Sequence, residues 1–282
     1  MGGHTPHRQP QLARRRDHGA LESASLAPVL ALRSLLGIPA LRRARQYGAL
    51  RLLQRLHRIS HRLPVQLRAP ECARVLVVAP HMDDDVIGPG GTLALHRQKQ
   101  SSITVVFCAA GATAEQDRTR KAEARAAADF MGFERVEWLD LPEGLLSPNE
   151  NLLARELAQL LEELHPDQIF CPYPADHHRD HSAVALALAA AIEQTGYDGD
   201  VWSYEVWSPL WPNVAVDITS VVDVKRKAID LYASQVAGLH YTEGTLGLNR
   251  YRGLRVYVDY AEAFFVADAK EFVALTREMN RV

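Results

Sequence analysis

Short apolar runs alternate with longer amphipathic stretches along this chain from residue 73 onward. The run from Val75 to Val78 contains three β-branched residues, which is typical of a strand buried on both faces of a parallel sheet. Runs of this kind predict strands at residues 74–78, 103–108, 135–139, 168–171, 201–206 and 255–259. Helical spacing predicts helices at residues 90–100, 117–131, 150–165, 181–194, 222–234 and 267–279.

Strands that alternate with helices predict βαβ units, a parallel sheet and right-handed crossovers. We therefore expect an α/β fold with a Rossmann-like, mostly parallel sheet flanked by helices. The chain has 282 residues, 47% of them hydrophobic, which is enough to bury a full core. It contains neither an internal repeat nor a low-complexity linker.

Charge divides the chain into two parts. Residues 1–70 contain 13 arginines, no lysine and only two acids, Asp17 and Glu22, so their net charge is +11. The remaining residues carry 19 basic and 32 acidic side chains, a net charge of −13. We expect a basic N-terminal arm over residues 1–70, partly disordered and partly amphipathic-helical, followed by one domain over residues 71–282.

Apolar residues in the arm recur at helical spacing between residues 28 and 59, with arginines between them. Such a helix is typical of contact with a membrane surface or an anionic partner. The alternative is that its apolar stripe packs on the chain's own acidic domain. Nucleic-acid binding is not expected, because the arm lacks interleaved aromatic residues for base stacking.

Composition also bears on the compartment. The three cysteines form no even disulfide framework, and two of them fall in predicted strands, which indicates a reducing environment. The apolar run at residues 26–32 is too short to span a membrane, and no clear signal-peptide cleavage site follows it. We expect a cytoplasmic protein, with the membrane surface as an alternative location.

The candidate chemistry begins where the first strand of the domain ends. Pro80 lacks an N–H for the sheet and stops that strand. One imidazole and three consecutive carboxylates follow it, those of His81, Asp83, Asp84 and Asp85. Adjacent carboxylates repel one another, so such a cluster at a strand end indicates a bound cation. The carboxyl ends of parallel strands are also where open α/β sheets bind their ligands.

Two other interpretations of this turn compete with a cation site. Three adjacent aspartates can form a solvated turn. The glycines that follow suggest a dinucleotide cradle, but Leu93 occupies the third position of that pattern, after Gly88 and Gly90. Histidine nitrogen with aspartate oxygen is instead a ligand set that zinc accepts, and it needs at least one more ligand.

A second polar turn follows the strand predicted at residues 168–171. It contains Asp176, His178, Asp180 and His181, directly before a predicted helix. Asp180 could serve only as a helix N-cap, and the histidines could be solvated. Because both turns follow parallel strands, however, we expect them at the same edge of the sheet, where they form one site.

The two turns resemble the hallmarks of the PIG-L/LmbE-like, metal-dependent N-acetylglucosamine deacetylases. These hallmarks are His-Pro-Asp-Asp-Glu and His-Pro-Asp-His, and here they are His81-Met-Asp-Asp-Asp85 and His178-Arg-Asp-His181. Weaker similarities occur around Arg120-Lys-Ala-Glu123 and Leu139-Asp-Leu-Pro-Glu-Gly144, and in later segments, within residues 73–266. Met82 and Arg179 replace prolines and Asp85 replaces glutamate, none of which removes a ligand.

The resemblance implies that His81, Asp84 and His181 bind one divalent metal, zinc or iron(II). Two neutral imidazoles and one carboxylate leave such an ion net positive, so it lowers the pKa of bound water towards about 7. The resemblance further implies catalytic and substrate-binding roles. They are Asp83 as general base, His178 as oxyanion stabiliser, Asp180 as the carboxylate behind His178, and Arg120 as a substrate contact.

The function that follows is a hydrolase that removes acetyl from an N-acetyl amino sugar, giving acetate and a free amine. Its substrate would be a small-molecule or lipid-linked amino sugar, as in glycoconjugate biosynthesis. The alternative is a non-catalytic α/β adaptor that docks to a membrane surface or a partner through its basic arm. The complete set of expected catalytic residues argues against the adaptor.

Overall fold

The computed structural model describes residues 65–280, so most of the arm predicted over residues 1–70, with its proposed membrane contact, lies outside the described residues. An eight-stranded sheet in the order β1-β7-β8-β6-β5-β2-β3-β4 forms its centre. The strands are β1 (Gln66–Leu67), β2 (Arg74–Ala79), β3 (Ser102–Ala110), β4 (Arg135–Pro142), β5 (Gln168–Pro172), β6 (Asp200–Tyr204), β7 (Val214–Asp217) and β8 (Ala261–Asp268). Strands β2 to β6 are mutually parallel, which confirms the predicted α/β class.

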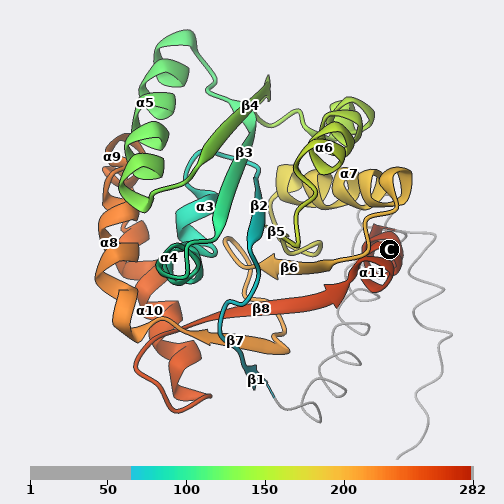
Figure 1. Cartoon of the computed structure of the whole chain (residues 1–282). Helices are drawn as coiled ribbons and strands as arrows, with labels where there is room; N and C mark the ends of the chain where they lie inside the picture. The colour runs from blue at the N-terminus through green and yellow to red at the C-terminus, as the bar shows by residue number, and fades with distance from the viewer. Residues whose placement is uncertain (1–64, 281–282) are drawn as a thin grey trace, which may run out of the picture. The chain divides into compact units, whose positions relative to one another are not determined.

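Helices cover both faces of the sheet (Figure 1). One layer contains α3 (Asp84–Ile87), α4 (Gly90–Gln98), α5 (Ala114–Met131), α8 (Val222–Asp230), α9 (Ala233–Val236) and α10 (Tyr241–Leu254). The other contains α6 (Glu150–Leu164), α7 (Arg179–Thr195) and α11 (Ala269–Asn280). Two short 3-10 helices, Ser147–Asn149 and Thr219–Val221, precede α6 and α8.

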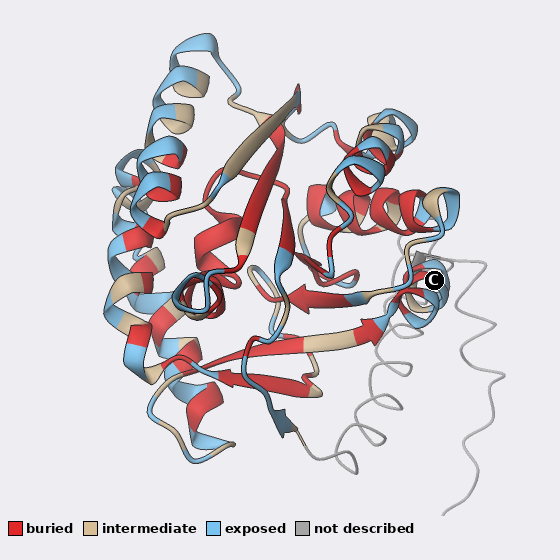
Figure 2. Ribbon diagram, viewed as in Figure 1, coloured by how far each residue is buried: buried red, intermediate tan, exposed pale blue. Residues whose placement is uncertain are grey.

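Strand β2 shows how the sequence produces these two layers. Successive side chains of a strand point to opposite faces, and both sets are apolar here. Leu76 and Val78 join the core beneath α6, α7 and α11, whereas Val75 and Val77 join the core beneath α4, α5 and α8. The central strands are accordingly buried along nearly their whole length (Figure 2). This burial fixes the carboxyl ends of β2 and β5 within the interior of the molecule.

The C-terminal part differs from the sequence prediction. The strand predicted at residues 255–259 is wrong, since these residues form a turn and β8 begins at Ala261. Tyr257 has φ of 60°, a left-handed conformation that a strand excludes. The close approach of Gly253 to the Val258 carbonyl, 2.5 Å from where a Cβ would stand, closes this turn. Strand β8 then runs antiparallel between β6 and β7.

The edge strand β1 comes from the end of the predicted arm. The Gln66 N–H donates to the Asn213 carbonyl at 2.9 Å, and the Arg68 N–H donates to the Ala215 carbonyl at 2.9 Å. Residues 66–68, which belong to the predicted arm, therefore pair with strand β7.

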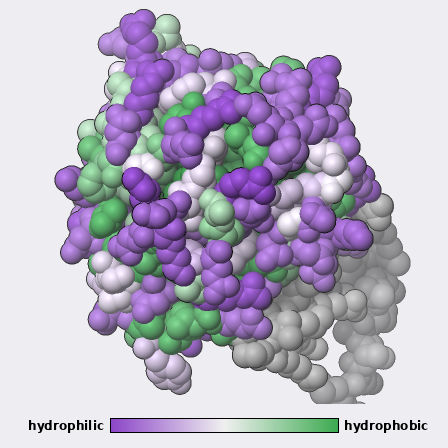
Figure 3. Space-filling model, viewed as in Figure 1, coloured by the Kyte–Doolittle hydropathy of each residue, from purple (hydrophilic) through white to green (hydrophobic). Residues whose placement is uncertain are grey.

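The surface seen in Figure 3 is mostly hydrophilic, with hydrophobic residues in scattered patches. Among residues 65–280, no helix combines the length and apolar character that crossing a membrane requires.

Candidate active site

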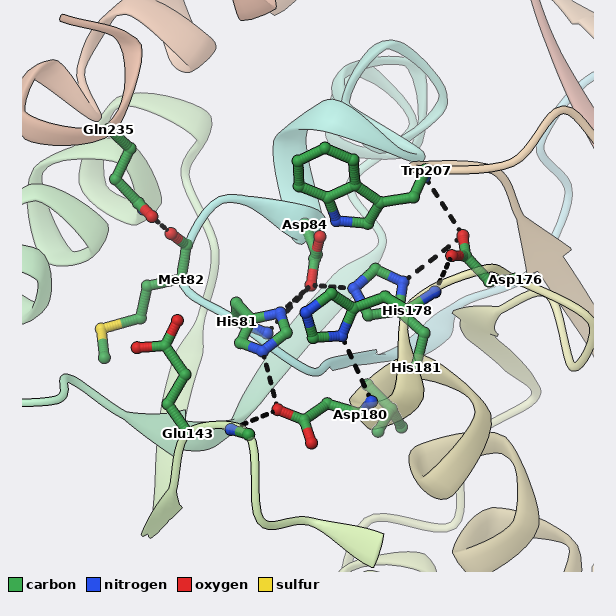
Figure 4. Close-up of polar contacts among 12 residues, drawn as sticks. His81, Met82, Asp84, Glu143, Asp176, His178, Asp180, His181, Trp207 and Gln235 are labelled. Atoms are coloured by element: carbon green, nitrogen blue, oxygen red, sulfur yellow. Dashed lines mark hydrogen bonds and ion pairs between the residues drawn. The ribbon is translucent and has the colours of Figure 1, made fainter. Parts of the chain in front are cut away.

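The two polar turns lie side by side at the carboxyl edge of the sheet. Strands β2 and β5 are adjacent and parallel, with Val75 opposite Gln168 and Val77 opposite Phe170. The turns that follow them therefore meet, and their side chains form one largely buried cluster of His81, Asp84, Asp176, His178, Asp180 and His181 (Figure 4).

Three donor atoms of this cluster face a common point. Asp84 Oδ2 lies 3.3 Å from His81 Nδ1 and 3.3 Å from His181 Nε2. The ligands of a tetrahedral ion with bonds of 2.0–2.1 Å are separated by about 3.3 Å, so the spacing fits a metal. His181 Nε2, which faces Asp84, is buried without a hydrogen bond, as a nitrogen that binds an ion would be. His81, Asp84 and His181 could therefore hold the metal that the sequence predicts.

Each of the two histidines also has a carboxylate behind it. His81 Nε2 lies 3.1 Å from Asp180 Oδ2, and His181 Nδ1 lies 3.5 Å from Asp176 Oδ2. Histidines that bind metals normally direct their second nitrogen to a carboxylate or carbonyl, which fixes the ring and raises its basicity. The arrangement around both rings has this form.

His178 is the third imidazole of the cluster. One ring nitrogen of His178, one of His81 and one of His181 all lie within 4.8 Å of one another. The ring centroid of His178 lies 4.8 Å from that of His81 and 5.0 Å from that of His181. His178 Nδ1 accepts the Asp180 N–H at 3.2 Å and so caps helix α7. In the neutral ring the proton is then on Nε2, which makes His178 a hydrogen-bond donor towards the site.

The carboxylate of Asp180 lies elsewhere than the sequence interpretation placed it. We expected it behind His178, but Oδ2 is beside His81 and accepts the Gly144 N–H at 2.7 Å. Oδ1 accepts the Leu146 N–H at 3.2 Å. Asp180 therefore ties His81 to the loop that follows β4, and its contact with His178 comes only from its backbone.

Asp176 has a position that the sequence interpretation did not assign. Oδ1 accepts the His178 N–H at 2.9 Å, while Oδ2 accepts the Trp207 N–H at 3.2 Å and faces His181. One carboxylate thus connects His178 and His181 to the loop that carries Trp207. The available signal was its place two residues before His178, within the same polar turn.

Electrostatics in the metal-free cluster favour positive charge on the imidazoles. Burial alone would lower the pKa of His81, but Asp180 and Asp84 outweigh it and raise that pKa to about 10. Burial likewise opposes protonation of His181, yet Asp84 and Asp176 raise its pKa to about 9. Burial works against ionisation of Asp84, but His181 and His81 outweigh it and hold the pKa of Asp84 well below its usual range. The cluster therefore attracts cations, whether protons or a metal.

Asp83 differs from Asp84 in both backbone and charge. Its φ of 146° is outside the regions that residues with side chains usually adopt, and the strain turns the chain into α3. Burial, followed by the neighbouring Asp84, raises the pKa of Asp83 well above its usual value. A buried carboxylate that binds a proton readily beside the candidate metal ligands is suited to general base catalysis.

The carboxylate of Asp85, the third aspartate of the first turn, points away from the candidate metal ligands. It is fully buried, and Oδ1 accepts the Tyr232 hydroxyl at 2.9 Å. Burial raises the pKa of Asp85 to about 7, although the Tyr232 hydroxyl opposes the shift. This contact links the first turn to the segment between α8 and α9.

Arg120, the predicted substrate contact, extends from α5 to the edge of the site. Its Nη1 donates to Glu143 Oε2 at 3.0 Å, a partner in the loop after β4. It lies close enough to Asp83 to oppose the rise in that residue's pKa. The two side chains of this pair are 16% and 31% exposed, so an incoming ligand could reach them.

Two segments with weaker family similarity also contact the site. Gln235 of α9 donates a hydrogen bond to the Met82 carbonyl. The Ser234 N–H and hydroxyl both donate to Glu123, each at 2.7 Å. These contacts hold α9 against α5 and against the first polar turn.

A buried ion pair supports the first turn from behind. Lys225 Nζ donates to the carbonyls of Ile87 and Gly88 at 2.8 and 3.0 Å and to Glu262 Oε1 at 2.5 Å. Glu262 in turn accepts the N–H groups of Gly91 and Thr92, both at 2.7 Å, at the start of α4. The sequence interpretation missed this pair, because its members are 37 residues apart.

Comparison with known proteins shows a family model and relatives that this chain resembles. A family model described as PIG-L, GlcNAc-PI de-N-acetylase, matches residues 76–192. The 4-oxalmesaconate hydratase of Pseudomonas putida is 29% identical over 190 residues, which cover 57% of this chain and 73% of that protein. A probable N-acetyl-α-D-glucosaminyl L-malate deacetylase 2 of Bacillus cereus is 27% identical over 58% of this chain and 84% of that protein.

A solved structure has a similar fold. The conserved protein TT1542 from Thermus thermophilus superposes with a TM-score of 0.60 and 31% identity, covering 69% of this chain and 94% of that chain. The family match contains both polar turns, from strand β2 to helix α7. Deacetylases of N-acetyl amino sugars are among the named relatives. Deacetylases are hydrolases. This chain belongs to the PIG-L family, also called LmbE-like.

Proposed function

We propose that this protein is a metal-dependent N-deacetylase, which hydrolyses the acetamide of an N-acetyl amino sugar to acetate and a free amine. The observation that carries the proposal is the pair of 3.3 Å separations from Asp84 Oδ2 to His81 and His181. Zinc fits this set of two imidazoles and one carboxylate, and iron(II) is the alternative. The family match and the deacetylases among the relatives support the same chemistry.

When bound, a divalent ion supplies Lewis acidity to the site and a lowered pKa to a water molecule. Asp83 would take a proton from the attacking water, whose oxygen bonds to the acetamide carbon. His178, with its proton on Nε2, would donate to the developing oxyanion. Asp83 would then return the proton to the nitrogen as the C–N bond breaks, so acetate and amine leave together.

Three further residues would position these groups or the substrate. Asp180 holds His81 and the loop after β4 through its two carboxylate oxygens. Asp176 holds His181 in the same way. Arg120, whose pairing with Glu143 leaves it partly exposed, would contact a sugar hydroxyl or a phosphate of the substrate.

A hydratase is the second candidate, because one of the relatives is a 4-oxalmesaconate hydratase. The charges around the site favour a neutral acetamide substrate over a multiply charged carboxylate such as the substrate of that hydratase. Arg120 is accompanied in the described part of the site by five carboxylates, those of Asp83, Asp84, Glu143, Asp176 and Asp180. A hydratase would release no amine, so one assay separates the two functions.

The test combines metal content with amine release. Wild type should contain about one divalent ion per chain by mass spectrometry and release amine and acetate from a panel of N-acetylglucosaminides. His181→Ala should lose both properties. His177→Ala is the matched control, because this exposed histidine is in the same turn and uses only its backbone N–H, towards Ser208. Wild type that binds no zinc or iron when supplied with either would overturn the proposal.

A further inference from the structure

A pocket of about 330 Å³ lies directly beside the candidate active site. It is bounded by the end of α3, the loop after β6 and helix α10, and Trp207 belongs to its wall. The indole of Trp207 also stacks on His178, with ring centroids 6.4 Å apart and planes at 25° (Figure 4). A ligand bound at the histidines would therefore have this pocket as its neighbour.

The walls of the pocket are largely apolar. Trp207 and Tyr241 meet edge to face, with centroids 6.0 Å apart. Trp207 and Leu239 are 49% and 54% exposed, which leaves apolar surface uncovered at the mouth. The remaining apolar contributions come from Ile87, Val206, Leu248 and Ala263.

Both carboxylates in the wall are already neutralised. Glu205 accepts from Arg252 Nε at 2.9 Å and from the Leu210 N–H at 2.9 Å. Glu262 is occupied by Lys225 and by the start of α4. Neither therefore selects a charged ligand.

One polar atom in the pocket is left without a partner. Asn249 is 4% exposed, and its Oδ1 is the single buried side-chain oxygen or nitrogen of the lining that lacks a hydrogen bond among the described residues. A buried acceptor of this kind is stabilised by a ligand that brings one donor.

We propose that this pocket binds an aryl aglycone carrying a hydroxyl group, so that the substrate is an aryl N-acetylglucosaminide; this inference rests on the proposed deacetylase function. The aryl ring packs against the exposed faces of Trp207 and Tyr241, where aromatic pairs gain from edge-to-face contact. The hydroxyl donates to Asn249 Oδ1. The volume suffices, since it is about twice the roughly 150 Å³ that encloses benzene in a dry cavity.

The test compares methyl, phenyl and 4-hydroxyphenyl N-acetylglucosaminides of one anomeric form on the metal-loaded enzyme. Amine release should give a kcat/KM that is at least about tenfold higher for the 4-hydroxyphenyl than for the methyl glycoside. Equal values for the three glycosides would overturn the proposal while leaving the deacetylase intact.

Two glycines of α10 provide a matched pair of variants. A side chain at either Gly244 or Gly247 would meet no atom within 4 Å of its Cβ, but only Gly244 lines the pocket. Gly244→Phe should therefore fill the pocket and bring the ratio of aryl to methyl kcat/KM close to one. Gly247→Phe should keep the wild-type ratio. Equal ratios in the two variants would contradict the proposal.

Two further measurements separate its parts. Asn249→Leu should abolish the preference for 4-hydroxyphenyl over phenyl while keeping that for phenyl over methyl. Calorimetry with the deacetylated glycosides, which carry a free amine, measures binding to the pocket without turnover. If no glycoside is hydrolysed but the aryl amines bind wild type more tightly than Gly244→Phe, the deacetylase proposal fails and the substrate assignment fails with it, while binding of the aryl group in the pocket stands.

Discussion

Two buried clusters lie around the first polar turn, and each pairs carboxylates with basic side chains. The two clusters are built differently. In the cluster of Lys225 and Glu262, Lys225 has three acceptors and Glu262 has three donors. In the cluster of His81, Asp84 and His181, the carboxylates face imidazoles that are not permanently charged, and His181 lacks a directed hydrogen bond.

The difference shows how structural and functional charge can be told apart. A buried pair that is complete within the protein holds the backbone and leaves nothing for a ligand. Imidazoles that face the carboxylates of Asp84, Asp176 and Asp180 are instead completed by a cation from outside, a proton or a metal. We therefore expect changes in the first cluster to affect folding and changes in the second to affect metal binding and catalysis.

The largest expected effect is on catalysis in the second cluster. Asp83→Asn removes the proposed general base while keeping the shape of the side chain. We expect kcat to fall by about 10²–10⁴, with metal content unchanged. Kinetics with an N-acetylglucosaminide and mass spectrometry on the same sample test this. Full activity in the variant would refute the base assignment.

In the first cluster, Lys225→Met should affect folding. It leaves the Glu262 carboxylate buried without its cation, which costs about 3–5 kcal/mol. Denaturant unfolding monitored by fluorescence would measure the loss, and the folded fraction should still bind metal. The double variant Lys225→Met with Glu262→Gln should be less destabilised than the single one. If Lys225→Met instead lost the metal and kept its stability, the first cluster would serve metal binding and not folding.

A smaller effect is expected behind the second cluster. Asp176→Asn keeps hydrogen-bonding capacity but removes the charge that faces His181 Nδ1. We expect metal affinity to fall about 10–100-fold, measured by competition with a chelator of known affinity. Asp198→Asn, a change on the surface away from the site, is the control. Unchanged affinity would show that Asp176 acts only on the backbone of the turn.

The smallest effect is on stability against pH. The fold raises the pKa of His81 and His181 to about 10 and 9. Protonated rings therefore stabilise the metal-free protein fully below about pH 6.5, and this stabilisation is lost as pH rises through about 9 and 10. Zinc needs neutral rings, so the gain in Tm on adding zinc should be larger at pH 9 than at pH 6. A gain of 1 kcal/mol corresponds to about 2–4 °C, and the opposite trend would exclude the raised pKa values.

The sequence predicted the parallel half of the fold because its strands are apolar on both faces. Strands β2 and β5 carry that pattern, and their order in the sheet brings the two polar turns together. The residues that meet there, His81, Asp84 and His181, could therefore be named before the structure was known. Their roles in binding and catalysis stay predictions.

The remainder depended on contacts that no local pattern encodes. Helix α10 contains three glycines, which lower helix propensity, and it forms because it packs on β8 and α8. The position of the Asp180 carboxylate follows from N–H groups of the loop after β4, which lie more than 30 residues away. The pairing of Lys225 with Glu262 is likewise a product of tertiary packing.

The backbone of Asp83 has a consequence for protein engineering. Its φ of 146° is a conformation that glycine adopts with little strain, and in other residues it costs on the order of 1–3 kcal/mol. A redesign that selected sequences for thermal stability alone would therefore favour glycine at this position and delete the proposed base. With Asp83 as the proposed base, turnover would favour aspartate at this position and thermal stability would favour glycine.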